Sequence, residues 1–294
     1  MDKCGRLDFV QMGLMLISSI FAGFVGALFG IGGGVIIVPT LTAFLGLGIK
    51  DAIATSIVGV VATSIAGASR YLKQGITNVK LALFLETSAT LGAMSGAMLE
   101  MVSPSSILFM ILAALLLFMA VNQAKTFREE ERRIRSGGFK GRGDRLSEGL
   151  RLSGSYNDAA DKVRVEYTPT RSKLGIAMSY FAGLFSGLLG IGGGVLKVPI
   201  MNQFMDVPMK VSVGTSKFMI GITASTAALV YFSFGLVKPE LASPVVLGVV
   251  MGATLGAMVM NRIKAGYLKL AFASLLVYFS YLMAEKGLSL MVGA

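Results

Sequence analysis

The sequence predicts an all-α polytopic membrane protein with about ten transmembrane helices, built as two inverted five-helix repeats. Three observations predict this fold class. Of the 294 residues, 54% are hydrophobic and only 15% are charged, whereas an average soluble domain carries about 25% charged residues. The charges are concentrated in one central segment, and the chain repeats itself. We therefore expect a multi-pass protein of the cell (inner) membrane.

The spans are the apolar runs between polar loops. Most are long enough to cross about 30 Å of hydrocarbon at about 1.5 Å per residue. The second and seventh are shorter, so their length leaves open whether they cross fully. The runs are Phe9–Gly30, Val35–Leu47, Ala52–Leu72, Val79–Leu99, Ser105–Val121, Leu174–Gly190, Val195–Met205, Val211–Phe234, Leu241–Met260 and Tyr267–Met283.

The two halves are copies of one another. Residues 21–56 and 181–216 share 16 identities in 36 positions without a gap. This internal duplication predicts two membrane repeats, at residues 9–122 and 174–285. The first apolar run has a copy deep in the chain, so we interpret it as a retained span and not as a cleaved signal peptide.

The segment between the repeats, residues 123–173, holds 21 of the 43 charged groups. Its mixed charges, interrupted by glycine and serine residues, predict a largely disordered cytoplasmic linker. Contact with anionic lipid headgroups is the alternative; nucleic-acid binding is disfavoured because aromatic residues are not interleaved. Lys/Arg bias also predicts that both termini lie outside. The bias changes sides between the copies, which predicts inversion of the second.

Each copy carries Gly-Ile-Gly-Gly-Gly-Val, at residues 30–35 and 190–195, followed by Pro39 or Pro199. The motif lacks the Gly-Lys-Ser/Thr ending of a nucleotide loop, so no nucleotide is expected. Close helix packing accounts for small residues before Gly30. Three consecutive glycines cost a helix about 1 kcal/mol each and predict an unwound break instead. Broken helices at matching places in two repeats indicate a transporter's binding site.

Two lysines inside predicted spans favour an anionic substrate. Lys197 and Lys217 stand where the first copy has Ile37 and Ile57, so the fold itself does not require either charge. Snorkelling to the interface or pairing with a carboxylate is the alternative for each. The predicted substrate-binding residues are Gly32, Gly33, Gly34, Thr55, Ser56, Gly192, Gly193, Gly194, Lys197, Asn202, Gln203, Thr215, Ser216 and Lys217.

Glu86 is the one carboxylate predicted to lie well inside a span. It is either a proton carrier or a structural partner for one of the two lysines, and the sequence does not distinguish these roles. Glu100, at the end of the same span, is expected at the membrane interface.

The duplicated Gly-x-Gly-Gly-Gly-(x)4-Pro motif, followed in each copy by a Thr-Ser pair (Thr55-Ser56 and Thr215-Ser216), resembles the sulfite exporter TauE/SafE family of membrane permeases. The resemblance covers residues 10–121 and 174–284 and omits the linker. It implies a secondary transporter, an exporter by the family's name, for a small sulfur-containing anion such as sulfite or an organosulfonate. It assigns this role to the glycine motifs, the two prolines and the two Thr-Ser pairs.

The predicted function is therefore alternating-access transport of a small anion, with a passive anion channel as the alternative. An enzyme is not expected, because the chain has no histidine and no Gly-x-Gly-Asp motif. A disulfide framework or Cys/His metal site is excluded by a single cysteine, Cys4. No cofactor, metal, nucleotide or nucleic-acid partner is expected, and the oligomeric state is left open.

Overall fold

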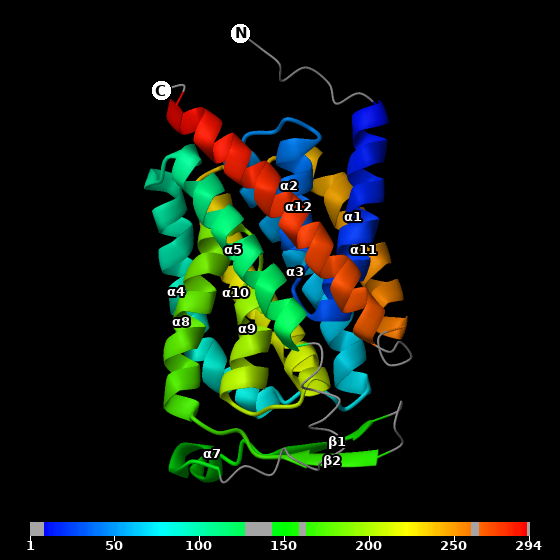
Figure 1. The fold of residues 1–294 in the computed structure, drawn as a ribbon, viewed down its shortest axis with the longest axis vertical. Helices are drawn as coiled ribbons and strands as arrows, with labels where there is room; N and C mark the ends of the chain where they lie inside the picture. The colour runs from blue at the N-terminus through cyan, green and yellow to red at the C-terminus, as the bar shows by residue number, and fades with distance from the viewer. Residues whose placement is uncertain (1–8, 127–142, 159–162, 260–264, 293–294) are drawn as a thin grey trace.

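The computed structural model describes residues 9–126, 143–158, 163–259 and 265–292. Eight of its helices are long and apolar enough to cross a membrane, which confirms a predominantly helical, polytopic membrane protein. These are α1 (Phe9–Phe29), α3 (Ile49–Lys73), α4 (Val79–Val102), α5 (Ser105–Thr126), α8 (Ser172–Leu189), α10 (Met209–Ser233), α11 (Pro239–Val259) and α12 (Ala265–Val292). They form one upright bundle (Figure 1).

The two short apolar runs form short helices. One is α2 (Gly34–Ala43); the other is α9 (Gly194–Pro199), continued by a π-helical turn, η1 (Ile200–Phe204). Ten residues of helix span about 15 Å, half of the hydrocarbon thickness. Helix α2 returns toward the end of the bundle at which α1 begins (Figure 1). The length of these two runs left open whether they cross fully; the structure shows half-length elements at both places beside the eight long helices.

The connecting loops gather at two opposite ends of the bundle (Figure 1). At one end, the side chain of Lys238 forms a salt bridge of 2.9 Å with Asp51. At that same end, Lys50 Nζ donates to the carbonyl oxygen of Met101 at 2.9 Å. The predicted linker lies at the other end, where Asn78 begins α4. Loops group in this way if each short helix returns the chain to the end of the bundle at which the long helix before it begins.

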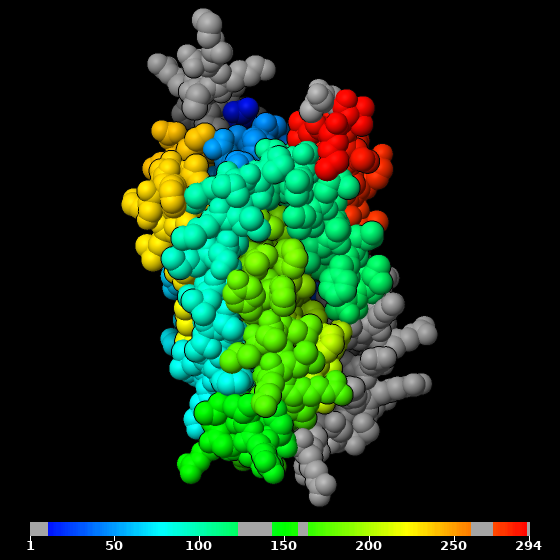
Figure 2. All heavy atoms as spheres, turned by 90° about the vertical axis from the view of Figure 1, so that its left-hand side faces the viewer, coloured from blue at the N-terminus to red at the C-terminus, as the bar shows by residue number. Residues whose placement is uncertain are grey.

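The helices of one half pack against those of the other half. Helix α1 lies along α11, and α4 lies along α8; α3 and α5 pack against α10 and α12. Figure 2 shows α4 (cyan) and α8 (light green) side by side over most of their length. Small residues permit this approach: a Cβ on Gly96 would overlap the carbonyl oxygen of Leu184, and one on Gly183 that of Ala89.

Part of the predicted linker is folded, which corrects the expectation of a largely disordered segment. Within the described residues it contains α7 (Arg145–Gly149) and an antiparallel hairpin of β1 (Gly154–Asp158) and β2 (Val163–Tyr167). We call residues 143–158 and 163–171 the linker module; it lies at the base of the bundle (Figures 1 and 2). Residues 127–142 and 159–162 of the predicted linker, and both chain ends, lie outside the described residues.

The linker module is docked onto both halves. Asn78 Nδ2 donates to the carbonyl of Leu152 (2.7 Å) and to the hydroxyl of Tyr167 (3.0 Å). On the second half, the N–H of Thr170 donates to the carbonyl of Met205 at 2.9 Å. Burial raises the pKa of Tyr167 to about 12, so its hydroxyl stays neutral. Packing against the bundle, absent from any local sequence signal, explains why this segment folds.

Asp144 ties the module to the start of α8. Its Oδ1 accepts from the N–H of Ser147 (2.9 Å), and its Oδ2 accepts from the N–H of Ser172 (2.7 Å). Burial opposes ionisation of this carboxyl, but hydrogen bonds from Ser147 and Ser172 favour the charged form more strongly and hold the pKa of Asp144 below its usual value.

Candidate functional site

The two glycine motifs are unwound segments at the centre of the bundle. Helix α1 ends at Phe29, and α2 begins at Gly34; helix α8 ends at Leu189, and α9 begins at Gly194. In each segment, three glycines adopt positive φ, a conformation that strongly favours glycine. These are Gly30, Gly32 and Gly33 in the first segment and Gly190, Gly192 and Gly193 in the second. Pro39 and Pro199 lie inside the short helices that follow.

The two segments run side by side in opposite directions. A Cβ on Gly34 would lie 2.5 Å from the carbonyl oxygen of Gly190, and a Cβ on Gly194 would overlap that of Gly30. Both alternatives considered for the motif therefore apply: each segment interrupts a helix, and its lack of side chains permits close packing against the other.

The side chains of Val60 and Ile220 pack against the two unwound segments. A Cβ on Gly32 would meet Val60 Cγ1 at 3.1 Å, and one on Gly192 would meet Ile220 Cγ2 at 3.1 Å. Ile220 is the counterpart of Val60 in the second copy, and both are fully buried. The sequence analysis did not single them out, because an apolar residue inside a span carries no distinguishing signal.

The Thr-Ser pairs bind protein atoms in three of four cases. Ser56 Oγ donates to the carbonyl of Gly190 at 2.9 Å, and Ser216 Oγ donates to that of Gly30 at 3.0 Å. Thr215 Oγ1 accepts from the backbone N–H of Asn78. Thr55 Oγ1 is buried and lacks a hydrogen-bond partner in the described part of the chain. The serines thus hold the unwound segments of the opposite half.

Lys197 is neutralised inside the protein. Its Nζ lies 3.1 Å from Glu86 Oε2, and both side chains are at most 4% exposed. Thr223 contacts both partners, and Thr90 Oγ1 donates to Glu86 Oε1 at 3.3 Å. The arrangement corresponds to the pairing alternative for Lys197 and gives Glu86 a structural partner. Thr223 was not predicted; its one sequence signal is that Thr63 stands at the same place in the first copy.

Lys217 is different, although it is equally buried. It is 0% exposed, and its Nζ meets no hydrogen-bond partner among the residues that the structure describes. Its aliphatic chain packs against Gly67 of α3, since a Cβ added to Gly67 would lie 3.3 Å from Lys217 Cδ. Its carbonyl accepts from Ser64 Oγ. Helix α10 therefore carries a buried amino group that lacks a hydrogen-bond partner or counter-charge within the described residues.

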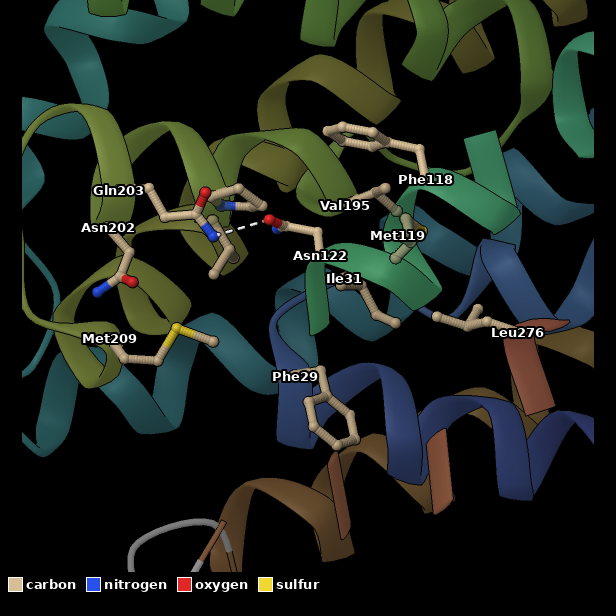
Figure 3. Close-up of a pocket in the computed structure, with 12 residues that line it drawn as sticks. Phe29, Ile31, Phe118, Met119, Asn122, Val195, Asn202, Gln203, Met209 and Leu276 are labelled. Carbon is tan, nitrogen blue, oxygen red and sulfur yellow. Dashed lines mark hydrogen bonds between the residues drawn. The ribbon is translucent and has the colours of Figure 1, made fainter. Parts of the chain in front are cut away.

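A cavity of about 40 Å³ opens in the linker-side half of the bundle. That volume holds a few water-sized groups. Figure 3 shows amide side chains on one side of it and apolar side chains on the other. Gln203 Nε2 donates to Asn122 Oδ1 at 3.0 Å, and Asn202 Nδ2 donates to the carbonyl of Val207 at 2.9 Å. Ile31 and Val195, beside the unwound segments, also line it.

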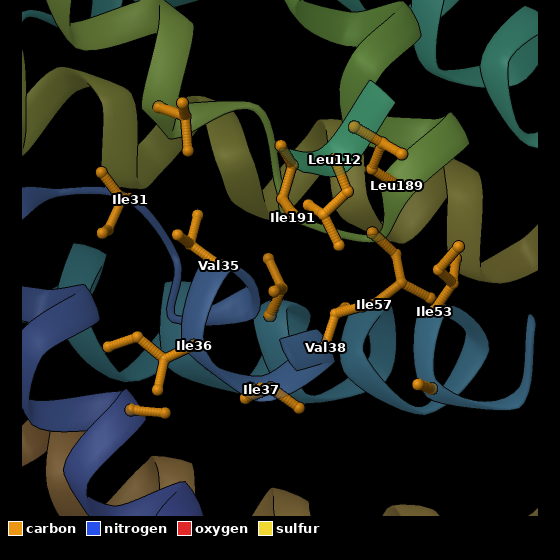
Figure 4. Packing of buried hydrophobic residues seen from close by; sticks show 14 of the residues in the cluster. Ile31, Val35, Ile36, Ile37, Val38, Ile53, Ile57, Leu112, Leu189 and Ile191 are labelled. Carbon is orange, nitrogen blue, oxygen red and sulfur yellow. The ribbon is translucent and has the colours of Figure 1, made fainter. Parts of the chain in front are cut away.

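Apolar packing surrounds the cavity. Phe29 and Ile31, which line it, and their second-copy counterparts Leu189 and Ile191 belong to one buried apolar cluster; Figure 4 shows Ile31, Leu189 and Ile191 in it. The structure brings Asn202 and Gln203 together with Asn122, a residue the sequence analysis missed.

Comparisons with known proteins agree with the resemblance seen in the motifs. The model of the family described as "Sulfite exporter TauE/SafE" matches residues 15–283. The chain is 27% identical over 264 residues to the Bacillus subtilis protein named "Probable membrane transporter protein YunE", covering 85% of this chain and 89% of that protein. A second Bacillus subtilis relative, "Probable membrane transporter protein YdhB", is 27% identical over 90% of this chain and 98% of its own length.

A plant relative matches a shorter stretch. The Arabidopsis thaliana protein named "Sulfite exporter TauE/SafE family protein 5" is 36% identical over 66 residues, which is 22% of this chain and 14% of the plant protein. No solved structure matches the chain.

Proposed function

The chain belongs to the sulfite exporter TauE/SafE family and is a membrane transporter protein; from that premise we propose that it exports a small anion by alternating access. The proposed substrate class is sulfite, an organosulfonate or a related sulfur-containing anion. The proposed machinery is two inverted five-helix halves that rock about the unwound glycine segments.

The buried amino group of Lys217, which has no partner among the described residues, carries this proposal. A charge in the hydrocarbon core costs about 2.5–3.5 kcal/mol on insertion scales, and such charges are usually paired or functional. Lys197 is paired with Glu86, whereas Lys217 has no such partner in the described residues. A small anion would supply the missing counter-charge.

The arrangement of the cavity supports a carrier over a passive channel. Val60 and Ile220 close against the glycine segments at the centre, and the cavity lies on the linker side of them. A channel needs one continuous path, but a carrier needs a path that is open on one side at a time. Rocking of the two halves about the closed centre would move the opening to the other end.

Pairings across the halves support a two-fold relation between the two copies. The pair α1–α11 and the pair α4–α8 exchange places when the halves are exchanged. The hydroxyl of Tyr71 donates to the carbonyl of Ala27 at 2.7 Å, and its second-copy counterpart Tyr231 donates to Gly187 at the same distance. The positive loops at the linker end support a cytoplasmic linker with both termini outside, so the cavity would face the cytoplasm, as loading of an exporter requires.

Ligand-induced stabilisation of the full-length chain in detergent tests the binding site. Sulfite, thiosulfate, sulfate, isethionate and acetate would be added to wild type, Lys217→Ile and the control Lys80→Gln. Lys80 is an exposed lysine at the linker end, and Ile57 is the apolar residue matching Lys217 in the first copy. A ligand at 100 times its Kd stabilises the folded state by about 2.7 kcal/mol.

We expect one of the sulfur anions to raise the midpoint of thermal unfolding of wild type and Lys80→Gln, but not of Lys217→Ile. Removal of an unpaired buried charge should leave Lys217→Ile at least as stable as wild type without ligand. An equal response in Lys217→Ile would refute the assignment. In proteoliposomes, a carrier gives uptake of labelled anion that unlabelled anion on the other side accelerates; conductance without such exchange would identify a channel.

A further inference from the structure

A second unpaired charge-bearing group lies at the end of the bundle opposite the linker. Glu100, in the last turn of α4, is 0% exposed. Neither of its carboxyl oxygens meets a hydrogen-bond partner within the described residues. It lies near the end of a span, as the sequence predicts, but its side chain is buried inside the protein and does not face water. A carboxylate buried without a partner is disfavoured strongly enough that such groups bind a proton instead.

The packing register places Glu100 against the C-terminal end of α8. Gly92 and Gly96 of α4 fit against Tyr180 and Leu184 of α8, so the two helices advance in step in the same direction. Glu100 is one turn beyond Gly96 on the same helix face. Helix α8 stops at Leu189, and its last carbonyl groups form the negative end of the helix dipole. That end also opposes an ionised carboxylate.

Few charged or titratable groups surround Glu100 in the described structure. Lys50, at the start of α3, acts on it electrostatically, although its Nζ is already bonded to the carbonyl of Met101. Tyr231 of α10 faces it, and its hydroxyl donates to the carbonyl of Gly187. The last two turns of α8, residues 181–189, contain no titratable residue. Glu100 therefore lies between α8 and α10 without a described partner that fixes its charge.

The fold itself does not require an acid here. The matching residue of the second copy is Met260, whose own placement lies outside the described residues. The partner helices are packed by the same kind of glycine contact in both copies, since Gly256 of α11 fits against Phe24 of α1. Glu100 is thus a titratable residue at a position where the other copy has an apolar one, as is Lys217, which matches Ile57.

Glu86 does not share these properties. It accepts hydrogen bonds from three side chains, including Lys197, which satisfies its negative charge inside the membrane. Of the two buried carboxyls on α4, Glu100 is therefore the one without an ion pair or hydrogen-bond partner among the described residues.

We propose that the carboxyl group of Glu100 is a proton-binding site, loaded from the end of the bundle opposite the linker, that couples proton movement to transport. In one state the neutral acid is buried against α8. In the other state Glu100 releases its proton to water. The resulting carboxylate is unfavourable in the packed position at the end of α8, next to the second glycine segment. The coupling part rests on the proposed transport function; proton binding does not.

Infrared difference spectroscopy of the full-length protein in nanodiscs tests proton binding directly. A neutral carboxylic acid in an apolar site gives a C=O stretching band that ionised and water-exposed carboxyls do not. We expect this band in wild type, its loss as the pH rises, and its absence at all pH values in Glu100→Gln. It should persist in the control Glu240→Gln, which removes an exposed carboxyl from the same end of the bundle.

Two results would overturn this assignment. One is a wild-type protein without the band; the other is a band that survives in Glu100→Gln. Glu100→Met, which introduces the residue of the other copy, serves if the glutamine variant fails to fold. Wild-type protein gives an independent answer, because dicyclohexylcarbodiimide adds to protonated carboxyls in apolar sites. Mass spectrometry should locate the adduct on Glu100; an adduct on Glu86, or none, contradicts the proposal.

Proteoliposomes with a trapped pH-sensitive dye test the coupling. Thiosulfate and isethionate serve as probes, because their charges do not change near neutral pH. We expect anion movement by wild type to change the internal pH, and loss of that change in Glu100→Gln. Anion movement by wild type without a pH change would refute coupling. Absence of movement of either probe would count against the proposed function instead, while the infrared band still decides whether Glu100 binds a proton.

Discussion

Removing either partner of the Glu86–Lys197 pair should destabilise the protein far more than removing both. The two side chains are 4% and 1% exposed and 3.1 Å apart. The single variants Lys197→Ile and Glu86→Val each leave one charge buried without its partner. Loss of one member of a buried pair costs about 3–5 kcal/mol.

The double variant reproduces a site that the protein already contains. In the other half, the matching residues are Ile37 and Val246, with Thr63 in place of Thr223. Replacing a buried ion pair with apolar residues is often neutral or stabilising. Thr223 would keep its bond to the carbonyl of Met219 (3.0 Å). We expect the double variant to lie within about 2 kcal/mol of wild type, since only a hydrogen-bonded network is lost.

Heating the detergent-solubilised proteins and measuring the monodisperse peak by size exclusion gives the comparison. At about 2 °C per kcal/mol for a chain of this size, the single variants should lose roughly 6–10 °C and the double variant less than about 4 °C. A double variant as unstable as the singles would refute the reasoning. Its transport activity decides the role that the sequence left open: a stable but inactive double variant would mean that Glu86 takes part in transport.

Three further predictions concern packing, a symmetric pair of hydrogen bonds and the linker module. Gly96→Ala should prevent stable folding because its Cβ overlaps a backbone oxygen of α8, whereas Gly13→Ala has open space around it and should be neutral; recovery of monodisperse protein compares them. Tyr71→Phe and Tyr231→Phe each remove one buried hydrogen bond of 2.7 Å, so both should cost a similar amount, about 1–2 kcal/mol, in the same thermal assay; a much larger loss in one would contradict their equivalence. The lowered pKa of Asp144 means that its contribution to docking is complete above the usual pKa of aspartate and is lost as the pH falls through the lowered value; the protection of residues 145–158 against hydrogen exchange, measured relative to an unstructured chain at the same pH, should therefore decrease at acidic pH in wild type, and be low and less pH-dependent in Asp144→Asn.

Much of the architecture could be predicted from local properties of the chain. Apolar length and charge segregation identified the long helices, and the glycine triplets located the unwound segments, because hydropathy and helix propensity act over a few residues. The duplication could be read by comparing the chain with itself. The cavity was anticipated in part: Asn202 and Gln203 were expected to contribute polar groups, but Asn122, which lies in the other half of the chain, was not.

The fold of the linker module could not be predicted from amino-acid composition. Residues 143–171 are polar and carry mixed charge, which favours disorder for an isolated segment. The described linker module folds because Asn78 and Met205, far away in the chain, offer hydrogen-bond partners. Such contacts belong to the assembled bundle and have no local signature.

The sequence by itself determined that this chain is a duplicated membrane protein with broken helices and unusual charges inside its spans. Only the tertiary structure decided what each charge meets. Lys197 and Lys217 looked alike, yet one is paired and the other has no partner in the described residues; Glu100 looked interfacial, yet it is buried. The reason is that periodicity specifies which face of a helix is apolar, whereas the partner of a side chain depends on the register between helices that lie far apart in the sequence.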